Sequence, residues 1–129
     1  MRVFIADDSS IIRERLITMI AAIPDSEVVG QAATINAARP SIHQLRPDVV
    51  ILDIQMPGGS GIDLLQELKQ NAASPLVLMI TTNAFPQYRK KCLDAGADYF
   101  FDKATEIQLL QETLCQLQSR FSTRPPPQE

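Results

Sequence analysis

The stretch VVILDIQMPGGSG, from Val49 to Gly61, poses the central question of this sequence. Its first four residues are all apolar, which predicts a short strand buried on both faces. The strand ends on a carboxylate, Asp53, and the loop that follows carries a proline and three glycines. Asp53 is therefore either a turn residue before a glycine-rich loop or a chemical group placed at the tip of a core strand.

Four other short apolar runs share the character of this strand, and segments with helical spacing separate them. The predicted strands are Val3–Ala6, Val28–Ala32, Val49–Leu52, Leu76–Ile80 and Tyr99–Phe101. The clearest apolar stripes at helical spacing are Ile12, Leu16, Met19, Ile20 and Ile23; Ile35, Ala38, Ile42 and Leu45; and Ile107, Leu110, Leu114, Leu117 and Phe121. The alternation predicts an α/β fold with a doubly wound, five-stranded parallel sheet and helices on both faces.

Prolines and glycines locate the ends of the predicted helices. Pro40 lies inside the second helical segment, where a proline costs about 3 kcal/mol, so we expect a kink or a late start there. Pro86 suits the first turn of the fourth helix, because its missing N–H is harmless at that position. Gly96 is expected to cap the C-terminus of the same helix.

Length and composition fit one globular domain. The chain has 129 residues, of which 45% are apolar, so it can bury a core without disulfides or a structural metal. After Phe121 the sequence STRPPPQE cannot continue a helix. We therefore expect one domain over residues 1–121 and a proline-rich tail, or the start of a linker, over residues 122–129.

The charge pattern argues against binding to nucleic acid or to an anionic membrane. The net charge is −3 and the isoelectric point is about 5.1. The densest basic cluster, Arg89–Lys91, is short and is predicted to be the solvated face of a helix.

Cysteine usage and the N-terminus predict a cytoplasmic protein. Cys92 and Cys115 form no CxxC pair and fall at apolar positions of predicted helices, so we expect buried free thiols in a reducing compartment. The N-terminal segment MRVFIADDSS has too short an apolar run for a signal peptide, and no stretch approaches the length of a membrane span.

Polar side chains follow four of the five predicted strands, at the edge where such sheets place ligands. They are Asp7 and Asp8 after the first strand, Asp53 after the third, Thr81 and Thr82 after the fourth, and Asp102 and Lys103 after the fifth. Crowded carboxylates repel one another, and a hard divalent ion such as Mg²⁺, which prefers oxygen ligands, relieves the repulsion. Lys103 can then neutralise an anion held at the metal, and Thr81 can donate a hydrogen bond to it. The set predicts a Mg²⁺-dependent site for a phosphoryl group.

Each of these residues also has a structural interpretation. Asp7 and Asp8, followed by two serines, could cap the first helix. A lone threonine is usually structural, and a lone lysine is usually solvated. Their joint placement at successive strand ends favours the functional interpretation. The single histidine, His43, is predicted to lie on the surface, which argues against nucleophile systems that depend on a histidine base.

From about Arg2 to Phe121 the sequence resembles the receiver domain of two-component response regulators. The matching motifs are VFIADDS for the acidic pair, PDVVILDIQMPGGSG for the phosphoacceptor strand and loop, ITT for the switch hydroxyl, and GADYFFDKAT for the lysine strand. They occur in the family's order and approximate spacing. The resemblance implies the flavodoxin-like receiver fold and a signalling phosphoprotein of a phosphorelay, whose only catalysis is its own phosphorylation and dephosphorylation.

The resemblance also implies a role for each site residue. Asp53 would be the nucleophile that takes a phosphoryl group from a histidine kinase or a phosphotransfer protein. Asp8 would bind Mg²⁺ directly and Asp7 through water, with Asp53 and the backbone carbonyl of Gln55 as further ligands. Lys103 would bind a phosphate oxygen.

A switch is implied in the same way. Thr81 would move to bond the acyl phosphate and Phe100 would change rotamer with it, altering a face of the fourth helix, fifth strand and fifth helix that could bind a partner or a second copy. The chain departs from the family pattern at three positions. Ala104 follows the lysine where proline is usual, which predicts a looser loop, Phe100 lacks a tyrosine hydroxyl, and Thr82 replaces a smaller residue and could restrict access.

Two other functions use a related fold or chemistry. A Mg²⁺-dependent phosphatase of the haloacid dehalogenase type needs a second aspartate two residues after the nucleophile, where this chain has Gln55. A flavodoxin-like electron carrier needs a hydroxyl- and glycine-rich phosphate loop where this chain has Asp7 and Asp8, which would repel the cofactor phosphate. The sequence leaves open whether this is a stand-alone receiver or part of a longer regulator with an output domain.

Overall fold

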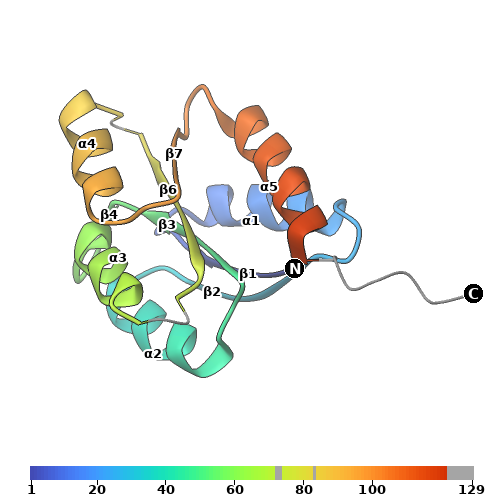
Figure 1. Cartoon of the computed structure of the whole chain (residues 1–129), viewed down its shortest axis with the longest axis horizontal. Coiled ribbons are helices and arrows are strands. Elements are labelled where there is room, and N and C mark those ends of the chain that lie inside the picture. Colours follow the sequence, from blue (N-terminus) through green and yellow to red (C-terminus); the bar gives the residue numbers. More distant parts are fainter. Residues whose placement is uncertain (72–73, 83, 122–129) are drawn as a thin grey trace, which may run out of the picture.

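The strands predicted from the sequence form one parallel sheet. The computed structural model describes residues 1–71, 74–82 and 84–121. In this part of the chain the sheet has five strands in the order β2-β1-β3-β6-β7 (Figure 1). Their bounds are β1 Arg2–Ala6, β2 Glu27–Ala32, β3 Val49–Asp53, β6 Leu76–Thr81 and β7 Tyr99–Asp102. Each predicted strand is confirmed to within one residue at either end.

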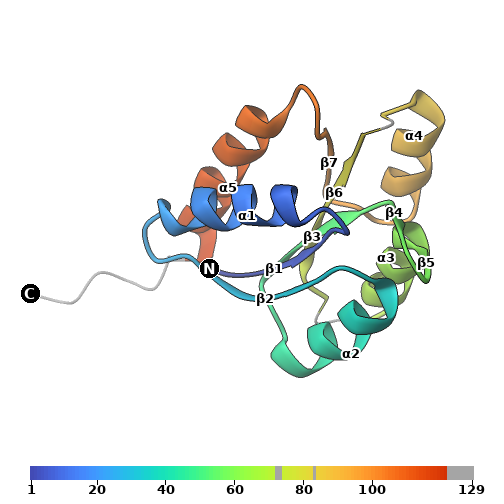
Figure 2. The same cartoon turned by 180° about the vertical axis from the view of Figure 1, so that it is seen from behind.

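Helices cover both faces of the sheet, as predicted. Their bounds are α1 Ser10–Ala21, α2 Ile35–Leu45, α3 Gly61–Lys69, α4 Pro86–Asp94 and α5 Ile107–Phe121. The helices α2, α3 and α4 pack on one face, and α1 and α5 pack on the other, as the front and back views show (Figures 1 and 2). The sheet therefore separates two buried apolar clusters.

The apolar run of β3 is explained by this arrangement. Val50 and Leu52 point into the cluster under α2, α3 and α4, whereas Val49 and Ile51 point into the cluster under α1 and α5. Because successive strand residues point to opposite faces and both faces are covered, all four side chains are buried.

The strand register brings the polar strand ends to one edge. Thr81, the last residue of β6, pairs with Asp102, the last residue of β7. Ala6, the last residue of β1, pairs with Leu52, which directly precedes Asp53. The acidic pair that follows β1 therefore emerges beside the end of β3.

The helix ends agree with the sequence analysis except at one proline. α2 begins at Ile35, directly after its N-cap Thr34, so the late start expected from Pro40 is wrong. The threonine hydroxyl accepts a backbone hydrogen bond and fixes the start ahead of the proline; the expected kink stays a prediction. Pro86 at the first position of α4 is confirmed, as is Gly96 after its last turn, with φ of +103°.

The loop after Asp53 contains structure that the sequence did not predict. Gln55–Met56 (β4) and Gly59–Ser60 (β5) form a small antiparallel hairpin. Gly58 and Gly59 turn the chain with φ of 89° and 149°, values that residues with a side chain rarely adopt. The glycine-rich segment is thus a hairpin with a defined register.

The two cysteines differ in their environment. Cys92 is buried, as predicted, whereas Cys115 is exposed, so the prediction of two buried thiols is wrong for Cys115. The buried side of α5 carries Leu110, Leu114 and Leu117. Cys115 follows Leu114 directly and lies about 100° further around the helix, where its side chain faces outward.

The expected tail, residues 122–129, lies outside the described residues, so the domain boundary at residue 121 stays a prediction. Within the described ranges, none of the helices combines the length and the apolar character that crossing a membrane requires.

Candidate functional site

Three carboxylates meet at the carboxyl edge of the sheet. Asp7, Asp8 and Asp53 each offer an oxygen, and these oxygens all lie within 4.8 Å of one another. They border a pocket of about 360 Å³. Its lining is Asp8, Ser9, Ile12, Asp53, Gln55, Thr81, Thr82 and Lys103. The structure thus brings together the acidic, hydroxyl and lysine residues that the strand ends predicted.

Asp7 is the most enclosed of the three carboxylates, with 0% of its surface exposed. The backbone N–H of Asp7 donates a hydrogen bond to the carbonyl of Ala32. The backbone carbonyl of Asp7 accepts one from the guanidinium of Arg13 at 2.7 Å. Its Oδ1 accepts a hydrogen bond from the backbone N–H of Ser9 at 2.8 Å. Ser9 is itself the N-cap of α1, so the capping interpretation holds for the serine and the aspartate supports that turn.

Lys103 is buried between two of the carboxylates. Its Nζ lies 2.6 Å from Oδ2 of Asp7 and 3.0 Å from Oδ2 of Asp53. The contact to Asp53 is a hydrogen bond, and the contact to Asp7 is a close ion pair. Lys103 therefore holds the two buried carboxylates together with one charge.

The charges at this edge do not balance. Three carboxylates surround the one ammonium of Lys103, and the guanidinium of Arg13 lies on the backbone carbonyl of Asp7 and forms no ion pair with their side chains, so negative charge is in excess around Lys103. Burial raises the pKa of Asp53, the hydrogen bond and charge of Lys103 oppose the rise, and the charge of Asp7 adds to it, so that the net pKa is about 6. Burial lowers the pKa of Lys103, but its two carboxylate partners outweigh burial, and the net pKa is raised above its usual value.

This imbalance gives a prediction for Asp53→Asn. The pKa of Asp53 is higher in the folded chain, so the folded state binds more protons between about pH 4 and pH 6 and loses stability as the pH rises through that window. Asparagine removes the ionised group. At pH 8, with a chelator present, the variant should be more stable than the wild type by about 1 to 3 kcal/mol.

Urea unfolding at pH 8 and at pH 4 measures this difference. The stabilisation should shrink towards zero at pH 4, where the wild-type carboxyl is protonated in the folded state. A variant that is less stable than the wild type at pH 8 would show that the ion pair with Lys103 outweighs burial.

The donor set fits a hard divalent cation. All three side chains offer carboxylate oxygens within 4.8 Å of one another, and their charges are in excess over the one ammonium that lies between them. Gln55 borders the same pocket, and its N–H donates to Oδ1 of Asp53 at 3.3 Å. These residues are compatible with Mg²⁺, which takes few carboxylates and keeps several waters.

The hydroxyls and the histidine lie as the sequence predicts. Thr81 is buried and lines the pocket, and its carbonyl accepts a hydrogen bond from the N–H of Lys103 at 2.8 Å. Thr82 is exposed and also lines the pocket, at the position where it could restrict access. His43 is exposed on α2, and none of the pocket's lining residues is a histidine.

Phe100 is separated from the pocket and lies in the core. It is 5% exposed and packs in the cluster under α2, α3 and α4. The guanidinium of Arg89 lies over its ring, 4.8 Å from the centroid. The sequence predicted that Arg89–Lys91 is a solvated helix face, and these residues are exposed, but the contact of Arg89 with Phe100 was not foreseen.

The structure explains why position 61 of the opening stretch is a glycine. A Cβ on this residue would lie 2.0 Å from the carbonyl oxygen of Asp53, and backbone cannot yield to that contact. The N–H of Gly61 donates to the carbonyl of Ile54 at 2.6 Å. The start of α3 is therefore packed directly on the backbone of Asp53, which a side chain would prevent.

The loop after β7 is held by side chain to backbone hydrogen bonds. Glu106 Oε1 accepts from the N–H of Asp102 at 2.9 Å, and Asp102 Oδ1 accepts from the N–H of Ala104 at 2.7 Å. The sequence predicted a looser loop here because alanine replaces proline. Two carboxylates, those of Asp102 and Glu106, bond to backbone N–H groups of this loop, and the expected looseness stays a prediction.

Comparison with known proteins gives one family. The family model described as the response regulator receiver domain matches residues 3–115. The chain is 34% identical over 114 residues to the uncharacterized transcriptional regulatory protein YvfU of Bacillus subtilis, covering 88% of this chain and 57% of YvfU. It is 40% identical over 103 residues to a protein-glutamate methylesterase/protein-glutamine glutaminase of Dechloromonas aromatica, covering 79% of this chain and 29% of that protein. The matched region thus covers between 29% and 57% of the length of these two relatives.

Solved structures agree with this assignment. The response regulator domain of Thermotoga maritima CheB has a TM-score of 0.80 at 28% identity, with 98% of each chain covered. The isolated receiver domain of RcsB from Salmonella enterica, solved with the phosphomimetic BeF3−, has a TM-score of 0.84 at 29% identity, covering 92% of this chain and 88% of that one. The sequence match and the shared fold lead to the same conclusion: the chain belongs to the response regulator receiver domain family.

Proposed function

We propose that Asp53 is the phosphoacceptor of this receiver domain. The observation that carries the proposal is the placement of its carboxylate: at the tip of β3, bordering the pocket, bonded to Lys103 and beside Asp7 and Asp8. Receiver domains act in two-component systems, so the donor is a histidine kinase or a phosphotransfer protein. Membership of this family argues against the phosphatase and the flavodoxin-like carrier.

The metal site is proposed on the same edge. Asp8 lines the pocket and is exposed, so it is assigned to direct contact with Mg²⁺. Asp7 is buried below it and is assigned a contact through water, with Asp53 and the carbonyl of Gln55 completing the protein ligands. When bound, the ion supplies positive charge that stabilises the transferred phosphoryl oxygens.

The chemical step transfers the phosphoryl group from a histidine nitrogen of the donor to a carboxylate oxygen of Asp53. A carboxylate oxygen of Asp53 attacks phosphorus and forms a P–O bond, while the P–N bond of the donor phosphohistidine breaks and its electron pair stays on the imidazole nitrogen. The ammonium of Lys103 is released from one of its carboxylates to meet a phosphoryl oxygen. The domain catalyses this transfer and the later hydrolysis of its own acyl phosphate, and we assign it no other reaction.

The phosphoryl group becomes a signal through Thr81 and Phe100. Its roughly two negative charges and new acceptor oxygens attract the Thr81 hydroxyl. Phe100 already lies inward under Arg89. We propose that phosphorylation raises the population of this inward packing and so changes the face formed by α4, β7 and α5, where a partner or a second copy binds.

The wider setting is also proposed. Residues 1–121 form the receiver, residues 122–129 are a tail or the start of a linker, and the protein works in the cytoplasm without binding nucleic acid or membrane through this domain. Its relatives include transcriptional regulatory proteins and methylesterases that are longer than this chain. An output domain of one of these kinds is a candidate for what the receiver controls.

Incubation with Mg²⁺ and acetyl phosphate tests the proposal. Intact mass should rise by one phosphoryl group per chain, and borohydride reduction followed by peptide mapping should place it at Asp53. No incorporation in the presence of Mg²⁺, or an acyl phosphate mapped to another residue, would reject the assignment.

Thr81→Ala should separate phosphorylation from signalling. Without the hydroxyl the variant should still accept phosphate at Asp53, but the α4, β7 and α5 face should respond weakly, since a ligand shifts an equilibrium only by its differential interaction with the two states. Amide chemical shifts with and without beryllofluoride measure the response. A full wild-type shift pattern in the variant would exclude Thr81 from the switch.

A further inference from the structure

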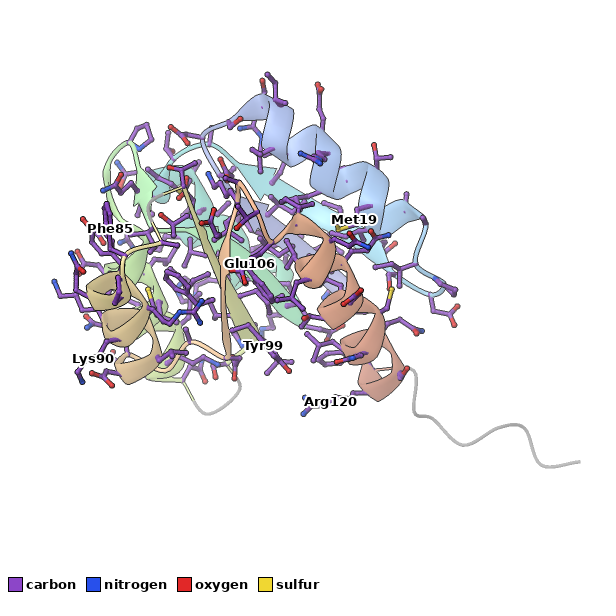
Figure 3. The ribbon with its side chains drawn as sticks, turned by 90° about the horizontal axis from the view of Figure 1, so that it is seen from above. Met19, Phe85, Lys90, Tyr99, Glu106 and Arg120 are labelled. Carbon is purple, nitrogen blue, oxygen red and sulfur yellow. The ribbon has the colours of Figure 1, made fainter. Side chains whose placement is uncertain are left out.

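The carboxylate of Glu106 closes the loop that carries Lys103. Its Oε1 accepts a hydrogen bond from the N–H of Asp102 at 2.9 Å, and its own N–H donates to the Asp102 carbonyl at 2.9 Å. Its carbonyl then accepts from Leu110 in the first turn of α5. Figure 3 shows Glu106 between α4 and α5. Asp102, the residue before Lys103, is thus bonded to Glu106, the residue directly before α5.

Lys103 depends on how its backbone is anchored. Its ammonium must lie between Asp7 and Asp53, at 2.6 and 3.0 Å, at the end of a flexible four-carbon side chain. On the strand side its N–H is held by the carbonyl of Thr81 at 2.8 Å. The bonds between Asp102 and Glu106 supply the second anchor and fix the chain across the lysine.

We propose that Glu106 is a positioning residue for Lys103, and that it acts through the hydrogen bond it accepts from Asp102. This inference rests on the proposed function, because it concerns the rate at which Asp53 takes a phosphoryl group. Glu106 borders neither the metal site nor the pocket, so its effect on the reaction passes through the loop. The position of Lys103 relative to the transferred phosphoryl oxygens is what the bond preserves.

A second contact of Glu106 must be separated from this role. Arg89 approaches Glu106 Oε1 to 4.0 Å, with both side chains partly exposed, so the pair is weak and screened. A glutamine at position 106 keeps an acceptor oxygen for Asp102 and loses this charge pair. Changing Arg89 instead would also remove its contact with the Phe100 ring, so glutamine at position 106 is the cleaner way to separate the two contacts.

Glu106→Ser is the decisive variant. Serine is a good N-cap and preserves the start of α5, but its side chain is too short to reach the N–H of Asp102. We expect the rate constant for phosphorylation by acetyl phosphate at saturating donor and Mg²⁺ to fall about tenfold. The Mg²⁺ dissociation constant and the thermal midpoint should change little, whereas general damage to the fold would change both.

The controls fix what each result means. Glu106→Gln, which keeps the acceptor oxygen for Asp102 and removes the charge pair with Arg89, should phosphorylate at close to the wild-type rate. A wild-type rate in Glu106→Ser, or a loss in Glu106→Gln as large as that in Glu106→Ser, overturns the inference. If the wild-type chain itself takes no phosphate at Asp53, the proposed function fails. If it does and Glu106→Ser matches it, only the role of Glu106 fails.

Discussion

Asp53→Asn is expected to abolish phosphorylation by acetyl phosphate. The amide lacks the anionic oxygen that attacks phosphorus, and no other carboxylate of the three is placed in the same way. Asp7 is wholly buried, and Asp8 is assigned to the metal. Intact mass spectrometry after incubation with Mg²⁺ and the donor should show no added phosphoryl group, while the wild type is modified once per chain.

Asp102→Asn is the matched control for this loss. Asp102 ends β7, two strands away from β3 in the sheet, and accepts its hydrogen bond from Ala104 through one oxygen, an arrangement that asparagine can keep. It does not line the pocket. The control should be phosphorylated like the wild type, and equal incorporation in Asp53→Asn would remove the central assignment.

Asp8→Ala should weaken Mg²⁺ binding far more than Asp7→Ala. Asp8 is exposed to the pocket, whereas Asp7 is buried and already bound by Ser9 and Lys103. Loss of a direct carboxylate ligand should raise the dissociation constant by about a hundredfold, or about 2.7 kcal/mol. Loss of a contact made through water should raise it by about tenfold or less.

Isothermal titration calorimetry suits this comparison because the chain contains no tryptophan to report on the site. Glu112→Ala, an exposed change on α5 remote from the pocket, controls for the altered net charge. Unchanged affinity in Asp8→Ala would show that Asp8 is not a ligand. A larger loss in Asp7→Ala would reverse the two assignments.

The sheet and the site were predictable because both depend on the order of elements. Once β3 is recognised as a strand buried on both faces, the parallel sheet follows, and parallel strands deliver their carboxyl ends to one edge. Asp7, Asp53 and Lys103 could therefore be grouped before any contact was known. Their distances to one another agree with that grouping.

The features that were not predicted depend on short range geometry or on distant contacts. Two-residue strands such as those around Gly58 are too short for periodicity to register. Cys115 is exposed because it lies one residue, or about 100° around α5, beyond the buried Leu114. The contact of Arg89 with Phe100 and the bonds of Glu106 arise only when α4, β7 and α5 pack together, and a polar residue in a loop gives no signal of this in the sequence.

The sheet that separates the two apolar clusters also limits which substitutions influence one another. Leu114 of α5 and Leu64 of α3 lie in different clusters, so the effects of substitutions at these two residues on the free energy of unfolding should add. Val50 and Ile51 are adjacent in β3 but pack in opposite clusters. A substitution that shifts the backbone at one of them therefore also changes the packing of the other cluster. Substitutions in helices on opposite faces of the sheet can therefore accumulate independently. Substitutions in the strands are the ones whose effects depend on the residues of both faces.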